Sequence, residues 1–161
     1  MGAAGVVVNG WVIVAHPLFL AEVDALIEEV ERLKNRHPKT YTTKSATKRL
    51  AAIRRLALEV IPADPSAVKF RQGTTLGGDY RVWRRAKFFQ QYRLFFRYSE
   101  KEGLIVLAWV NGPSTLRAYG SERDAYRTFQ RMLNVGNPPS SWQELGNESQ
   151  AATPLAPSSG D

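Results

Sequence analysis

The chain has 161 residues, 43% of them hydrophobic, and its 22 Lys and Arg against 15 Asp and Glu give a formal net charge of +7. This length fits one domain with a sizeable core, and the positive charge favours nucleic acid or another acidic partner. The lack of cysteine excludes disulfides, thiol nucleophiles and cysteine zinc sites. Because no apolar run approaches the ~20 residues of a membrane-spanning helix, we expect a soluble cytoplasmic protein with no membrane partner.

Two amphipathic helices are predicted in the first part of the chain, after a flexible start over residues 1–8 and a short strand or arm at 9–15. His-Pro pairs at 16–17 and 37–38 mark the ends of the first helix, whose apolar residues recur at helical spacing. The second is predicted over residues 43–61, and together they form a helical hairpin. The polar side of this second helix is almost entirely basic, with Lys44, Lys48, Arg49, Arg54 and Arg55. That side could bind ribosomal RNA or could be an ordinary solvated face.

The most distinctive stretch is 82–99, in which cations alternate with aromatic residues and no acid, Gly or Pro occurs. It predicts two strands joined by a turn near Gln90 and Gln91, because aromatic residues suit a pleated, half-buried surface. Strand alternation gives each strand an apolar side and a basic side. The basic side carries Trp83, Arg85, Lys87, Arg93, Phe95 and Arg97. We expect the helical hairpin to cover the apolar side and the other side to stay open as a concave basic floor, suited to phosphates and unpaired bases.

The rest of the chain completes an α+β pattern. Residues 69–80 predict a loop without the features of a phosphate-binding loop. Residues 104–110 are apolar on both faces and predict an interior strand, and 121–133 predict a third, C-terminal helix. Beyond the last anchoring residues, 146–161 have the composition of a disordered tail. The expected fold is therefore a helical hairpin packed on an antiparallel-rich sheet, followed by a C-terminal helix.

Five motifs give the sequence a resemblance to a known family. They are N-G-W-x-x-x-A-H-P-x-F at 9–19, D-A-L-x-x-E-V-E-x-L-K at 24–34, W-x-R-x-K-F at 83–88, Y-R-L-F-F-R-Y-S-E-K at 92–101 and T-L-R-x-Y-G-x-x-x-D-A-Y at 115–126. Over roughly residues 9–145 the chain closely resembles the YhaV family of bacterial toxins, within the wider RelE-like group. The resemblance implies a single RelE-like domain over 1–145.

The same resemblance implies a type II toxin–antitoxin toxin, an endoribonuclease that cleaves mRNA, commonly on the ribosome, and so inhibits translation and growth. It also implies a PrlF-like antitoxin with an AbrB-type domain, and contact with operator DNA only through the antitoxin complex. Cleavage in this group is metal-free, and no cofactor is expected. His16 and His37 are each followed by Pro, so we interpret them as helix-end residues rather than as metal ligands or an acid–base pair.

Cleavage by attack of a 2′-hydroxyl needs a base, stabilisation of the phosphorane and protonation of the leaving oxygen. The resemblance places phosphorane stabilisation on Arg93 and Arg117, since a guanidinium is always charged and forked for phosphate. Lys87 is the candidate general base, which requires neighbouring arginines and partial burial to lower its pKa. Tyr119 could stack on a base or donate the proton.

Four further residues are candidates for RNA binding, each with an alternative. Arg85 and Arg97 could hold phosphates or pair with helix acids. Tyr126 could stack on a base, but its helical spacing suits packing at least as well. Trp83 is a stacking candidate for which a place in the core is the favoured alternative. A non-catalytic RNA- or DNA-binding module that uses the same basic face remains the alternative function.

Overall fold

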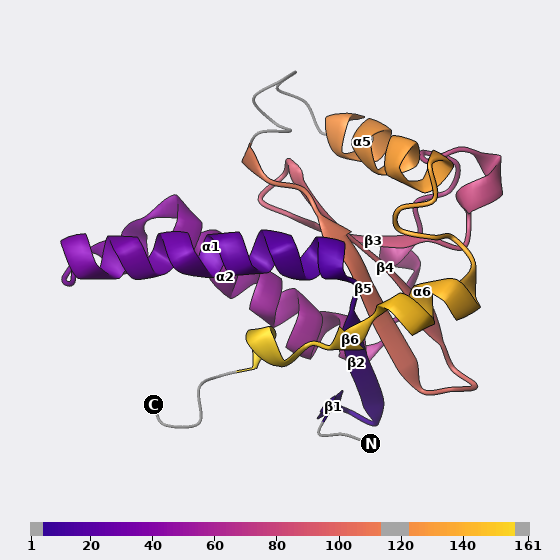
Figure 1. The fold of residues 1–161 in the computed structure, drawn as a ribbon, viewed down its shortest axis with the longest axis horizontal. Helices are drawn as coiled ribbons and strands as arrows, with labels where there is room; N and C mark the ends of the chain where they lie inside the picture. The colour runs from indigo at the N-terminus through magenta and orange to yellow at the C-terminus, as the bar shows by residue number, and fades with distance from the viewer. Residues whose placement is uncertain (1–4, 114–122, 157–161) are drawn as a thin grey trace.

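A six-stranded, mostly antiparallel sheet lies at the centre of the computed structural model, which describes residues 5–113 and 123–156 (Figure 1). Its strands are β1 (Val6–Val8), β2 (Trp11–Ala15), β3 (Arg84–Phe88), β4 (Tyr92–Ser99), β5 (Leu104–Val110) and β6 (Gln150–Ala151). They lie in the order β1-β2-β5-β4-β3, and β6 pairs with the end of β2. Within the described residues β2 and β5 run parallel and the other neighbours antiparallel. With the helices, this confirms an α+β structure.

Helix α1 (Pro17–Arg36) and helix α2 (Ser45–Arg55) lie near the predicted positions and contact each other. His16 is the N-cap of α1, where its Nδ1 accepts a hydrogen bond from the Leu18 amide at 3.1 Å, and His37 is the C-cap. Both histidines are therefore helix-end residues, as predicted. Helix α2 continues through a π-helical turn at Leu56–Val60 into a last turn at Ile61–Ala63.

The first hydrophobic core lies between these helices and one face of the sheet. Alternate residues of β4 and β5 point into it, among them Leu94, Phe96, Ile105 and Leu107, all of which are fully buried. The predicted apolar side of the 82–99 stretch is thus covered by α1 and α2 (Figure 1).

The opposite face of the sheet is covered as well, which corrects the expectation of an open basic floor. Helix α5 (Arg123–Asn134) and helix α6 (Trp142–Glu148) pack on it (Figure 1). Phe129 of α5 stacks on Phe95 at a centroid distance of 4.3 Å and on Trp109 at 5.9 Å. A register shift between Phe95 and Phe96 turns both Ala108 and Trp109 toward this second core. Burial of the large rings on this face is favourable, and α5 covers them. The basic surface that stays exposed therefore lies at the edge of the sheet.

The two ends of the chain are more ordered than predicted. Val6–Val8 form β1 and pair with β2 through a turn at Asn9 and Gly10, which have φ of 51° and 82°. Such an Asn-Gly turn matches the twist of a two-residue hairpin, so the flexible start is corrected for residues 6–8.

The predicted disordered tail is corrected for residues 146–156. Residues 150–151 pair with β2 as β6, and Leu155 lies fully buried in the first core. The tail composition is polar on average, but Leu155 at its end supplies the apolar contact that holds the segment against α1. Residues 157–161 lie outside the described residues.

Candidate functional site

The exposed edge of the sheet at β3 carries a basic groove. It has a volume of about 450 Å³ and lies between β3, the turn at Val68–Phe70 and the end of the second helix. Its lining residues are Leu56, Val60, Val68, Lys69, Phe70, Arg71, Arg85, Ala86 and Lys87. Among these described residues four are Lys or Arg and none is Asp or Glu. The groove therefore offers an apolar floor with uncompensated cations, which suits a polyanion.

The loop that brings Lys69 and Arg71 to the groove is held by one buried amide. Gln72, only 5% exposed, donates from Nε2 to the Tyr80 carbonyl at 2.8 Å. Its Oε1 accepts from the Thr75 hydroxyl at 2.7 Å. The backbone of Arg71 forms an isolated antiparallel β-bridge with the backbone of Arg84, at the start of β3. The loop is thus a fixed wall of the groove rather than a loose connection.

Behind the groove one tyrosine hydroxyl joins two arginines. Tyr126 of α5 accepts a hydrogen bond from Arg85 Nε at 2.8 Å and from Arg93 Nε at 3.1 Å. Arg85 also donates to the Lys69 carbonyl at 2.8 Å, so its guanidinium is fixed beside the groove that it lines. The structure therefore gives Tyr126 a positioning contact with both candidate arginines, with its ring edge-on to Phe95.

Arg93 is buried, although it was predicted to contact phosphate directly. Only 1% of the residue is exposed, and its guanidinium donates to the carbonyls of Gln90 and Tyr92 at 2.7 and 2.9 Å. Its backbone amide donates to the side chain of Asn111 at 2.7 Å. In this arrangement Arg93 fixes the base of the β3–β4 hairpin and its guanidinium has almost no surface for RNA, which corrects the expected direct contact.

Lys87 and Arg93 face each other across β3 and β4, because they are register partners. Lys87 is exposed at the groove. The partial burial that its role as a general base was expected to need is therefore absent. Arg117 and Tyr119 lie outside the described residues, so their predicted roles stay predictions.

Trp83 belongs to the second core, and the half-buried Arg97 packs against its ring. The Arg97 guanidinium lies between two indole rings, 5.8 Å from the centroid of Trp83 and 5.4 Å from that of Trp142, and donates to the Ser140 carbonyl. Burial, and next the charge of Arg84, lowers the pKa of Arg97. Trp83 is fully buried and packs edge-on against Phe129 at 5.0 Å. No surface of its ring is free for a base, so the stacking prediction for Trp83 is corrected in favour of its core alternative.

Sequence reasoning missed Lys69 and Arg71 because they lie in a stretch that was interpreted as a loop carrying a possible short strand. The available signal was the alternation of cation, ring and cation in Lys69, Phe70 and Arg71, which repeats the pattern of the 82–99 stretch.

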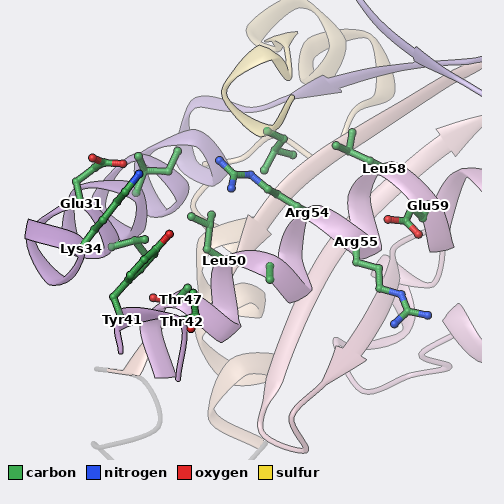
Figure 2. A pocket seen from close by; sticks show the side chains of 14 residues that line it. Glu31, Lys34, Tyr41, Thr42, Thr47, Leu50, Arg54, Arg55, Leu58 and Glu59 are labelled. Atoms are coloured by element: carbon green, nitrogen blue, oxygen red, sulfur yellow. The ribbon is translucent and has the colours of Figure 1, made fainter. Parts of the chain in front are cut away.

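A larger hollow of about 600 Å³ lies between α1 and the second helix, and the predicted site residues do not line it. Figure 2 shows its mixed lining, with Glu31 and Lys34 from α1 facing Leu50 and Arg54 from α2, while Arg55 points away. Both signs of charge occur around it, so it lacks the uniform charge of the β3 groove. Within the described residues no group of three His, Asp or Glu side chains could hold a metal ion. No described helix is long and apolar enough to cross a membrane.

Comparison with known proteins gives one consistent family. A family model described as "Toxin with endonuclease activity, of toxin-antitoxin system" matches residues 13–150. The chain is 48% identical over 145 residues to the "Ribonuclease toxin YhaV" of Escherichia coli strain K12 and to the "Toxin YhaV" of Escherichia coli O6:H1, covering 89% of this chain and 94% of each relative. No solved structure matches the chain. The chain therefore belongs to the YhaV family of toxins with endonuclease activity from toxin–antitoxin systems.

Proposed function

We propose that this protein is an endoribonuclease toxin that cleaves mRNA without a metal ion and so inhibits translation and growth. The observation that carries the proposal is the groove along β3, where Lys69, Arg71, Arg85 and Lys87 meet with no acid among the described lining residues. Unpaired RNA has the negative charge that such a groove attracts, and an endonuclease family favours the enzyme over the non-catalytic module.

In the proposed reaction the 2′-oxygen of one nucleotide attacks the adjacent phosphorus and the bond to the 5′-oxygen breaks. The products are a 2′,3′-cyclic phosphate and a free 5′-hydroxyl; the proton leaves the 2′-hydroxyl and another protonates the 5′-oxygen. The negative charge that develops on the non-bridging oxygens of the phosphorane needs fixed cations. Arg85 supplies one, because Tyr126 and the Lys69 carbonyl hold its guanidinium beside the groove. Lys87 lies on the same strand and is placed to contact the same phosphate.

Arg93 has a different role in this proposal. It acts as a positioning residue: through the shared hydroxyl of Tyr126 it orients Arg85, and through the hairpin carbonyls it fixes the turn that follows Lys87. The proposed roles of Arg117, in stabilising the phosphorane, and of Tyr119, in stacking or proton donation, follow from the family resemblance alone. In this proposal the proton that leaves the 2′-hydroxyl passes to water in the open groove.

The proposed partners are mRNA, the ribosome and a PrlF-like antitoxin with an AbrB-type domain, in a cytoplasmic setting. A toxin–antitoxin family implies an antitoxin, and the net charge of +7 suits both an acidic antitoxin and ribosomal RNA. We propose that operator DNA is contacted only within the antitoxin complex. We also propose that the sheet with its N-terminal helical hairpin is a RelE-like fold.

The test is cleavage of an mRNA by purified toxin, with translating ribosomes in one arm and without ribosomes in the other. Fragments that end in a 2′,3′-cyclic phosphate are expected, and in the ribosome-free arm the addition of EDTA should leave their rate of formation unchanged. Fragments with a 5′-phosphate and a 3′-hydroxyl would overturn the proposed chemistry. They form when water attacks phosphorus and the bond to the 3′-oxygen breaks, which leaves no cyclic phosphate.

A further inference from the structure

A second basic hollow lies at the tip of the β3–β4 hairpin, on the other side of the edge strand from the Tyr126 network. It has a volume of about 220 Å³ and is lined by Ser45, Lys48, Arg49, Phe89 and Tyr92. The first three belong to the first turns of α2 and the last two to the hairpin. Two of the five are cations, and the described lining contains no acid.

Phe89 presents a free aromatic ring at this hollow. It is 53% exposed, and the ring contact that holds it is with Phe88, at a centroid distance of 5.6 Å. Its φ of 46° is unusual for a bulky residue, which adopts left-handed backbone only at a cost. A turn of this kind is ordinarily built with Gly or Asn, so a bulky residue here costs stability, and half of its surface stays exposed.

The other wall of the hollow carries two cations, of which Arg49 is partly unsatisfied. Arg49 is only 8% exposed, lies over the Tyr92 ring at 5.6 Å and has a buried Nε with no hydrogen-bond partner. One of its terminal nitrogens donates to the Tyr92 hydroxyl at 3.4 Å, and the other lies 3.7 Å from Glu29. Lys48 is exposed beside it.

Helix α2 adds to the positive charge of this wall. It begins at Ser45, and no side chain caps its first amides. A helix N-terminus without a side-chain cap, next to Lys48, is a favourable place for a phosphate.

We propose that this hollow binds one unpaired nucleotide of the RNA, with its base stacked on Phe89 and its phosphate next to Lys48 and the first turn of α2. This rests on the proposed ribonuclease function and adds a subsite to it. Phe89 follows Lys87 by two residues, so their Cα atoms are at most about 7 Å apart. The nucleotide in this subsite is therefore a close neighbour of the one held in the β3 groove, and its base could contribute to sequence preference without any hydrogen bond to the base edge.

The test measures binding independently of cleavage. Short single-stranded RNAs with 2′-O-methyl groups cannot form the cyclic product, and a 2-aminopurine placed at successive positions reports stacking by loss of fluorescence. The variants are Phe89→Ala and Phe89→Trp, with Val82→Ala as the matched control, because Val82 is also exposed, at 51%, but does not line the hollow.

Phe89→Ala is expected to weaken binding about 5- to 150-fold, the range measured for loss of one base stack, and to abolish quenching at one position. Phe89→Trp should retain both, and Val82→Ala should bind as wild type. Lys48→Gln, on an exposed side chain that cannot affect folding strongly, should reduce the slope of log affinity against log salt by about 0.7. Unchanged affinity and quenching in Phe89→Ala would overturn the inference.

Two further outcomes distinguish an RNA subsite from a protein-binding surface, and the subsite from the cleavage chemistry. If Phe89→Ala leaves RNA affinity unchanged and weakens only capture of a co-expressed antitoxin, the hollow is a protein contact and the inference is wrong. If wild-type protein gives no cyclic phosphate but Phe89→Ala still weakens binding, the subsite stands and the proposed cleavage chemistry fails.

Discussion

Replacing Tyr126 by Phe removes one hydroxyl that accepts hydrogen bonds from two arginines. Arg85 is partly exposed, so water can replace its lost bond and little stability is lost there. Arg93 is 1% exposed, and a hydrogen bond to a buried charged group contributes about 1.5–3 kcal/mol. We therefore expect Tyr126→Phe to lower the free energy of unfolding by about 2 kcal/mol, with a fall in melting temperature of about 4–8 °C for a chain of this size.

Urea unfolding followed by tryptophan fluorescence measures this loss. Tyr80→Phe is the matched control, since it removes a hydroxyl of the same kind whose bond to Asn134, at 2.7 Å, is exposed to solvent. The control should lose less than about 1 kcal/mol. RNA cleavage should fall in Tyr126→Phe because Arg85 is then held by one contact fewer. Equal destabilisation by both substitutions would refute the role assigned to the Tyr126 hydroxyl.

Substitutions at four other residues test separate parts of the structure. Lys87→Ala removes one cation that contacts the reacting phosphate, so it should lower cleavage by a factor of about 10²–10³ in single-turnover kinetics. Because Lys87 is exposed, urea unfolding should give a stability within about 0.5 kcal/mol of wild type; normal cleavage would remove Lys87 from the site. Trp83→Ala should cost about 3–5 kcal/mol in unfolding free energy. Trp83→Leu, which has no ring to stack on a base, should keep RNA affinity, and a loss of affinity in the folded variant would restore the stacking role. His16→Ala should lower the free energy of unfolding by about 1 kcal/mol in urea unfolding, because it removes the N-cap of α1. Glu148→Gln, measured in the same way, should show how much of this loss depends on the 2.8 Å contact between His16 and Glu148.

Local patterns in the sequence predicted the elements of the fold well. The His-Pro pairs gave the ends of α1, and strand alternation correctly separated Leu94 and Phe96 from Phe95 on the other face. The pattern of one strand carries no information on which helix packs over it. The basic face was therefore expected to be open. Phe95 and Trp109 were the signal that could have corrected this, since two large rings on one face require a partner such as Phe129.

The candidate site was predictable only in part, for the same reason. Arg85 and Lys87 lie in the groove as parts of a basic strand, and the sequence identified that strand. Whether a cation on such a strand reaches solvent depends on the helix packed over it, so the burial of Arg93 and the half-burial of Arg97 could not be predicted. Lys69 and Arg71 reach the groove through the contacts of Gln72, which join residues of a loop that has no periodic pattern.

The central claim is that RNA lies in the groove along β3, and the salt dependence of RNA binding by a double variant tests it most directly. Lys69→Gln with Arg71→Gln removes two groove cations that contribute no side-chain hydrogen bond to the Tyr126 network. The control, Arg32→Gln with Lys39→Gln, removes the same charge from exposed positions at α1 and beyond its end, outside the groove. For a non-cleavable single-stranded RNA, the slope of log affinity against log salt should fall by about 1.4 in the groove variant and stay near the wild-type value in the control. Equal slopes in the two variants would contradict the placement of RNA along β3.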